Sequence, residues 1–188
     1  MINKGFNNKV YISSVVLLCV LTYLLNCCTA IYQCALIFIA IAITTNVITS
    51  IYDKSKALKG LAFSILVSFT LLWKLPYYID GKLVNGLVFA SFSSVMVSMY
   101  WLTAIFQILR RKYNFAISNA LSLAVAALID GVIMGVFFVI NNGFTYERIL
   151  DIFKRELFYK GLYGAGASVI IATAFYIFKN NTKLKIGN

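Results

Sequence analysis

Apolar residues form six long runs in this sequence of 188 residues, and clusters of charged residues separate most of them. One helical crossing of a bilayer takes about 20 apolar residues. The runs lack the polar–apolar alternation, in blocks of about ten residues, that a transmembrane strand shows. The pattern predicts an all-α polytopic membrane protein with six transmembrane helices at about 10–25, 30–51, 58–79, 83–109, 113–140 and 157–178.

The segment before the sixth run has an amphipathic pattern. Its apolar residues recur at helical spacing (Tyr146, Ile149, Leu150, Phe153 and Leu157), and most of the positions between them are charged. Two of the charged pairs, Asp151/Arg155 and Glu156/Lys160, stand four residues apart, where side chains meet on a helix surface. This pattern predicts an interfacial amphipathic helix that anchors the last span, with a lid as the alternative role.

Composition agrees with this fold class. Hydrophobic residues make up 61% of the chain and charged residues 12%, whereas a soluble domain is about one quarter charged. The mean hydropathy of +0.86 excludes a soluble enzyme, a disordered chain and a nucleic-acid-binding domain. We expect residues 1–188 to form a single integral membrane domain whose first run stays a span and is not cleaved as a signal peptide.

The net charge of +11 comes from basic residues that stand mostly between the runs. Eleven Lys and Arg residues fall on the side of the predicted helices that holds both termini, and six fall on the other side. Short cytoplasmic loops carry an excess of Lys and Arg. We therefore expect a multi-pass protein of the cell inner (cytoplasmic) membrane with both termini in the cytoplasm.

The sequence lacks several of the residues and motifs that catalysis, metal binding and nucleotide binding commonly use. The sequence has no histidine and no phosphate-binding G-x-x-x-x-G-K-[ST] motif. Its four cysteines lack C-x-x-C spacing and are expected to be inert thiols: Cys19, Cys27, Cys28 and Cys34. We predict no enzyme activity, no metal site and no cofactor.

An acidic residue, Asp130, stands in the middle of the fifth predicted helix, with at least sixteen uncharged residues on either side. A carboxylate at mid-membrane costs about 2.5–3.5 kcal/mol on insertion scales, so it usually serves a function. Helical geometry places Asn119 and Asn141 on the same line as Asp130, with Ser122 within about 80° of it. We predict a substrate site at Asp130, Asn119 and Ser122; the alternative is hydrogen bonding between helices.

Two further residues are candidates for the same site. Asn46 lies in the second predicted helix, among hydroxyl residues that can bond to their own backbone, whereas its amide cannot be satisfied so simply. Trp101 falls near the middle of the fourth helix, where its ring could stack on a flat substrate. Packing in the core or against lipid is the alternative for Trp101.

Short motifs over about residues 40–178 resemble the queuosine precursor transporter family, a group of six-helix membrane proteins also known as vitamin-uptake-transporter-like. The resemblance rests on Thr45–Ala57, Ala90-Ser91, Arg110–Lys112, Asn119–Ser122 and Ile129-Asp130, and on Lys160 before the last helix. The chain diverges from the family pattern at Asn46, Ser50, Asp53, Met99, Leu102 and Ser118.

The resemblance implies import of 7-cyano- or 7-aminomethyl-7-deazaguanine for salvage into the tRNA base queuosine. A carboxylate such as Asp130 would then accept the N–H groups of the guanine-like edge. Asn119 would donate to the carbonyl group, and Trp101 would stack on the ring.

Three functions are therefore open. The first is a transporter of a deazapurine-like heterocycle that works by alternating access. The second is the substrate-binding subunit of a multi-component vitamin importer, with separate ATPase and scaffold partners. The third is a non-transporting membrane assembly protein, in which the Asn119–Asp130–Asn141 line would pack tightly on a neighbouring helix.

Overall fold

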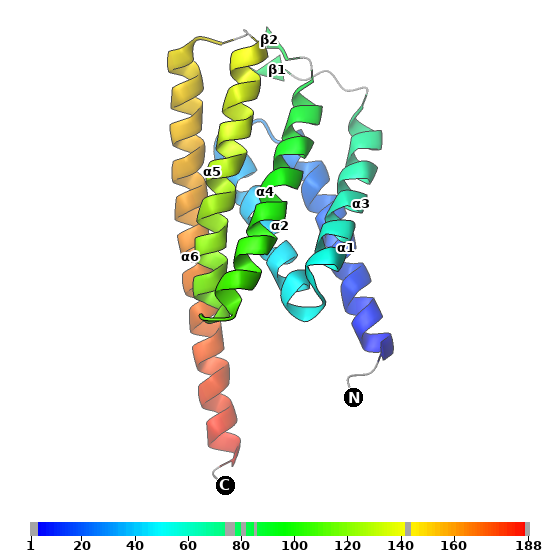
Figure 1. The fold of residues 1–188 in the computed structure, drawn as a ribbon, viewed down its shortest axis with the longest axis vertical. Helices are drawn as coiled ribbons and strands as arrows, with labels where there is room; N and C mark the ends of the chain where they lie inside the picture. Colours follow the sequence, from blue (N-terminus) through cyan, green and yellow to red (C-terminus); the bar gives the residue numbers. More distant parts are fainter. Residues whose placement is uncertain (1–3, 74–77, 80–81, 85, 142–143, 187–188) are drawn as a thin grey trace.

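The computed structural model describes residues 4–73, 78–79, 82–84, 86–141 and 144–186. These residues form a bundle of six helices (Figure 1), each long and apolar enough to cross a membrane. The two termini lie at the same end of the bundle. The prediction of an all-α polytopic membrane protein is confirmed, with helices α1 Lys4–Cys27, α2 Ile31–Ile51, α3 Lys54–Leu72, α4 Leu87–Arg110, α5 Phe115–Asn141 and α6 Tyr146–Ile186.

Helix α2 is the centre of the bundle, because it contacts all five other helices. Its side chains Phe38, Ile41 and Ile48 are almost fully buried in the main apolar cluster. Leu18 of α1 and Met99 of α4 pack into the same cluster. The other helices therefore cover much of α2, and polar side chains such as Asn46 that are buried against them are shielded from the surroundings.

The third helix differs from its predicted bounds of 58–79. It begins at Lys54, because the Asp53 side chain caps it by accepting a 2.6 Å hydrogen bond from the Lys56 backbone N–H. It ends at Leu72. Further along, β1 (Tyr78–Ile79) pairs antiparallel with β2 (Lys82–Leu83), so the predicted end of the helix lies in a short hairpin.

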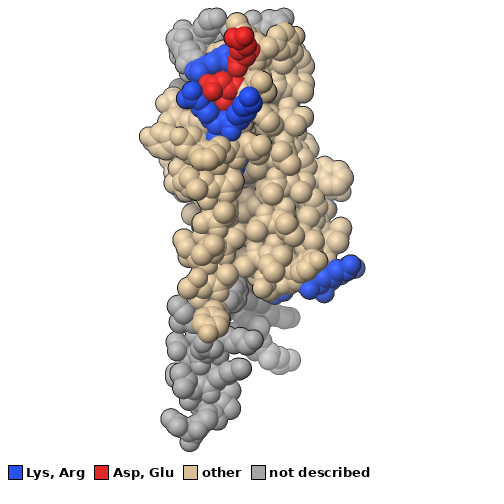
Figure 2. Space-filling view, turned by 90° about the vertical axis from the view of Figure 1, so that its left-hand side faces the viewer, with Lys and Arg blue, Asp and Glu red and all other residues tan. Residues whose placement is uncertain are grey.

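Helix α6 also differs from the prediction. The Thr145 hydroxyl caps it by accepting from the Arg148 backbone N–H at 3.4 Å, and the helix then runs without a break to Ile186. The amphipathic segment is therefore the first turns of α6, beside α5, and the prediction of a separate interfacial helix is wrong. Its charged side chains Arg148, Asp151 and Arg155 lie on the outer face near the start of α6, above a largely uncharged surface (Figure 2). Glu156 and Lys160, by contrast, face the interior.

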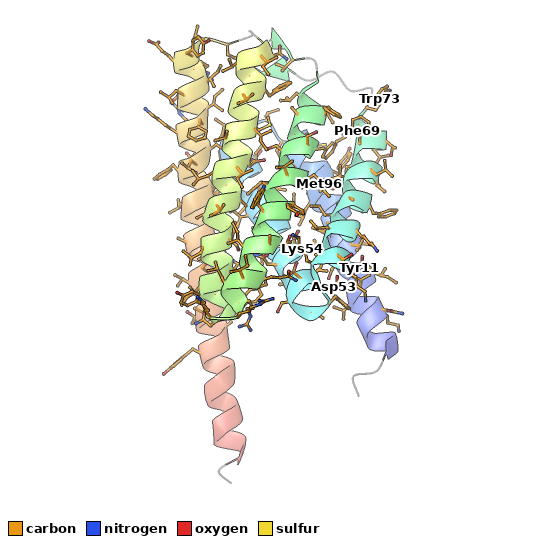
Figure 3. The ribbon with its side chains drawn as sticks, viewed as in Figure 1. Tyr11, Asp53, Lys54, Phe69, Trp73 and Met96 are labelled. Atoms are coloured by element: carbon orange, nitrogen blue, oxygen red, sulfur yellow. The ribbon has the colours of Figure 1, made fainter. Side chains whose placement is uncertain are left out.

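Helices α3 and α4 are linked at two levels. At the start of α3, Lys54 points toward α4, where its ammonium lies 3.8 Å from the centroid of the Tyr100 ring (Figure 3). Near the other end of α3, Phe69 makes edge-to-face contacts with Trp73 and with Phe92 of α4, with centroid distances of 5.5 and 6.2 Å. Such cation–π and aromatic contacts add to the apolar packing between the two helices.

The missing side chain of Gly131 lets α6 pack closely against α5. A Cβ atom at this position would lie 2.7 Å from the Phe153 ring, whereas a Cβ at Gly135 would meet nothing within 4 Å. Both substitutions to alanine raise helix propensity equally. We predict that Gly131→Ala has a lower melting temperature in detergent than Gly135→Ala, by the equivalent of about 1–3 kcal/mol. Equal melting temperatures would show that Phe153 moves aside without loss.

Candidate functional site

Asp130 is 5% exposed and is held from two neighbouring helices. The Ser94 hydroxyl of α4 donates to Asp130 Oδ1 at 2.5 Å. The Lys160 ammonium of α6 donates to Asp130 Oδ2 in a short, charge-assisted hydrogen bond. Both carboxylate oxygens of Asp130 therefore already have a donor within the bundle.

Lys160 has a second acidic partner on its own helix. Its Nζ lies 2.6 Å from Glu156 Oε1, one turn earlier in α6, and 4.1 Å from the centroid of the Phe38 ring of α2. We call Asp130, Glu156 and Lys160 the ion triad. With Ser94 and Phe38, the triad connects α2, α4, α5 and α6 in the interior of the bundle.

The sequence pattern pairs Lys160 with Glu156 on one helix but does not place Lys160 beside Asp130. Asp130 stands eleven residues before the end of α5, and Lys160 fourteen residues after the start of α6. At about 1.5 Å per residue these positions lie about 16 and 21 Å from the connection, and a helical side chain leans toward the N-terminus of its helix. The Asp130 and Lys160 side chains therefore lean toward each other and meet at about the same level of the bundle.

A second polar group joins α2 and α5 nearer the end of the bundle that holds the termini. Asn46 Nδ2 donates to Asn119 Oδ1 at 2.9 Å and to Ser122 Oγ at 3.2 Å. We call Asn46, Ser118, Asn119 and Ser122 the amide cluster; all four residues are fully buried. Three of its atoms have no hydrogen-bond partner among the described residues: Asn46 Oδ1, Ser118 Oγ and Asn119 Nδ2. Buried polar atoms are rarely left in this state, so the amide cluster is chemically incomplete.

The structure thus brings together three of the five predicted site residues and separates the others. Asn119 and Asp130 both face the interior, as predicted, but eleven residues of helix put them about 16 Å apart. A bicyclic heterocycle is shorter than this distance. In this conformation Asp130 and Asn119 are therefore too far apart to bind one such substrate together, and their assignment to a substrate site stays a prediction.

Trp101 is far more exposed than the residues of the ion triad and the amide cluster. It is 49% exposed on the outer surface of α4, edge-to-face with Tyr100. The neighbouring Tyr100 ring is covered by Lys54. The prediction that Trp101 stacks on a substrate inside the bundle is thus not supported, because the spacing along the sequence showed its depth but not the face of α4 on which it lies.

An open groove of about 470 Å³ runs between α5 and α6 on the outside of the bundle. Gly131 and Phe153 lie at one end of it, and its lining is almost entirely apolar. Asp130 does not belong to the lining, although it precedes Gly131 in the chain. The groove therefore lacks the hydrogen-bonding groups that a polar solute would need.

No family model, curated protein or solved structure matches this chain. The resemblance to the queuosine precursor transporters remains a prediction that rests on its short motifs.

We predict that Asp130 and Lys160 are energetically coupled. Asp130→Asn and Lys160→Met should each destabilise the purified protein, because each leaves a buried charge without its main partner. The double variant should lose less unfolding free energy than the two single variants lose together. The difference, the coupling energy, should be about 1–3 kcal/mol. Thermal unfolding of the four proteins in one detergent measures it.

The surface pair Asp151 and Arg155 provides the matched control for this cycle. Their side chains also meet, at 2.9 Å, but are 40% and 61% exposed. The same cycle on this pair should give a coupling energy of no more than about 0.5 kcal/mol. Similar coupling at both pairs would contradict a special role for the interior pair.

Proposed function

We propose that this chain is a membrane transporter for a small, uncharged, flat heterocycle, and that the amide cluster recognises it. The observation that carries the proposal is the set of three unpartnered polar atoms at the contact between α2 and α5. Asn119 Nδ2 offers a donor and Asn46 Oδ1 an acceptor, which together match a ring edge that presents a carbonyl group beside an N–H group. We further propose that the protein is not an enzyme.

A 7-deazaguanine carries such an edge, so a queuosine precursor is the specific substrate that we propose. The resemblance of the Thr45–Ala57 and Asn119–Ser122 segments to the queuosine precursor transporters supports this choice. These two segments include Asn119 and Ser122, and also Asn46, at which the chain departs from the family pattern. The three residues meet in the amide cluster although more than seventy residues separate Asn46 from the other two.

The ion triad would then act away from the substrate. Transport by alternating access needs groups of helices that move against each other around a binding site. Asp130, which also accepts from Ser94 of α4, binds Lys160 from the α4–α5 side, whereas Glu156 lies on α6 together with Lys160. We propose that α6 shifts against α4 and α5 at the triad, when the contact between Lys160 and Asp130 forms or breaks.

The test is uptake of labelled 7-cyano-7-deazaguanine by cells that cannot make it and that express this chain. Asn46→Leu and Asn119→Leu should each lower uptake about tenfold or more, since each removes hydrogen bonds to the substrate. Thr103→Val is the matched control: Thr103 is also fully buried, but it bonds only to backbone carbonyls of its own helix. Uptake no higher than in cells with an empty vector would contradict the proposal.

A non-transporting assembly protein is the second candidate. It is favoured by the tight packing of the Asn119–Asp130 line, with Asn119 fully buried and Asp130 paired with Lys160. In that case the amide cluster would hold only ordered water. Binding separates the two candidates: the deazaguanine should raise the melting temperature of a transporter but not of an assembly protein.

We also propose that the protein lies in the cell inner membrane with both termini in the cytoplasm, as the distribution of Lys and Arg indicates. Alkaline phosphatase, which is active only outside the cytoplasm, should be inactive when fused after Asn188 and active when inserted after Gly143. The opposite pattern of activity would reverse the orientation.

A further inference from the structure

The ion triad has an unbalanced charge. It contains two carboxylates and one ammonium, so it would carry a net charge of −1 if all three groups were ionised. The Asp130, Glu156 and Lys160 side chains are 7%, 18% and 1% exposed. A buried charge without a partner is strongly unfavourable, and an acid in this position tends to bind a proton instead.

The surrounding helices supply no second cation among the described residues. From α2, the triad faces the Phe38 ring and the Cys34 thiol, and from α4 it faces the Ser94 hydroxyl. None of these groups carries a positive charge. One further positive charge is therefore needed to balance the triad.

The hydrogen bonds indicate which acid receives this charge. Asp130 accepts from Ser94 with one oxygen and from Lys160 with the other, which is the arrangement of an ionised carboxylate. Glu156 accepts from Lys160 through Oε1, and it is the more exposed of the two acids. Glu156 is thus the acid that a proton can both reach and neutralise without breaking the Asp130–Lys160 pair.

We propose that Glu156 is a proton-binding site: it holds one proton while Asp130 pairs with Lys160, and it releases that proton to water when Lys160 leaves Asp130. On release the Glu156 O–H bond breaks and the new carboxylate becomes the sole partner of Lys160. Asp130, which has lost its cation, takes up one proton in turn, so that no buried charge is left without a partner. Because Glu156 lies one turn from Lys160 on the same helix, α6 can shift against α5 without leaving the ammonium unpaired. Coupling of this proton to transport rests on the proposed function, whereas its presence on Glu156 does not.

Infrared difference spectroscopy with exchange into D2O tests this on the purified full-length protein at neutral pH. A protonated carboxyl group gives a C=O band that shifts on deuteration and is distinct from the carboxylate bands. We expect this band in the wild type and its loss in Glu156→Gln. We also expect its loss in Asp130→Asn, although Glu156 is intact there, because Lys160 then has Glu156 as its only acidic partner. Asp151→Asn, which alters a surface acid, should leave the band unchanged.

A third variant covers the case in which Asp130→Asn does not fold. Lys160→Met removes the ammonium from both acids, so both should bind protons and the band should become about twofold stronger. A wild-type protein without the band, or a band that persists in Glu156→Gln, would overturn the proposal. Because the measurement reads protonation and not uptake, a protein that shows the band but imports nothing would refute transport alone.

Discussion

A lysine ammonium held between two carboxylates inside the bundle restricts how its helices can pack. Lys160 meets Asp130 only if α5 and α6 keep one vertical register, and Ser94 and Phe38 extend this restriction to α4 and α2. Apolar residues of the same size often stabilise a protein as well as a buried ion pair does. Apolar packing, however, tolerates small sliding between helices, whereas this pair does not. While Lys160 is paired with Asp130, the ion triad therefore fixes the arrangement of the helices more than it adds to their stability.

Helix α5 carries the two polar groups at different depths, and they differ in character. The ion triad is charged, and both oxygens of its central carboxylate have donors. The amide cluster is neutral and keeps three unpartnered atoms. A charged group with bonded partners suits a joint between helices, while a neutral group with open donors and acceptors suits recognition of an uncharged solute. In the proposed transporter, this separation would let one helix serve both roles without a substrate disturbing the ion pair.

The sequence was sufficient to predict the six helices, because each apolar run has the length of a bilayer crossing and charges mark most of the ends. It also identified Asp130, Asn119 and Asn46 as interior polar residues, since such residues are costly in a membrane. The contact of Lys160 with Asp130 was not predicted, because the depth of Lys160 depends on where α6 begins. A single capping residue, Thr145, sets that start. A serine in an apolar run such as Ser94 is most simply explained by close helix packing. Its hydrogen-bond partner is known only from the three-dimensional structure. Trp101 shows the same limit of the sequence. The position of a residue along a helix gives its depth in the membrane, but not whether its side chain points into the bundle or away from it.

Helix α6 is by far the longest helix of the chain, with 41 residues, and its end extends beyond the other helices (Figure 1). A rod of about 60 Å is about twice the thickness of the hydrocarbon layer. Lys160 lies near one third of its length, about 39 Å from its last residue. A tilt of roughly 10° about that point would sweep the tip sideways by about 7 Å. Small movements of α6 near Lys160 would thus be magnified at the far end of the helix, where another molecule could sense them.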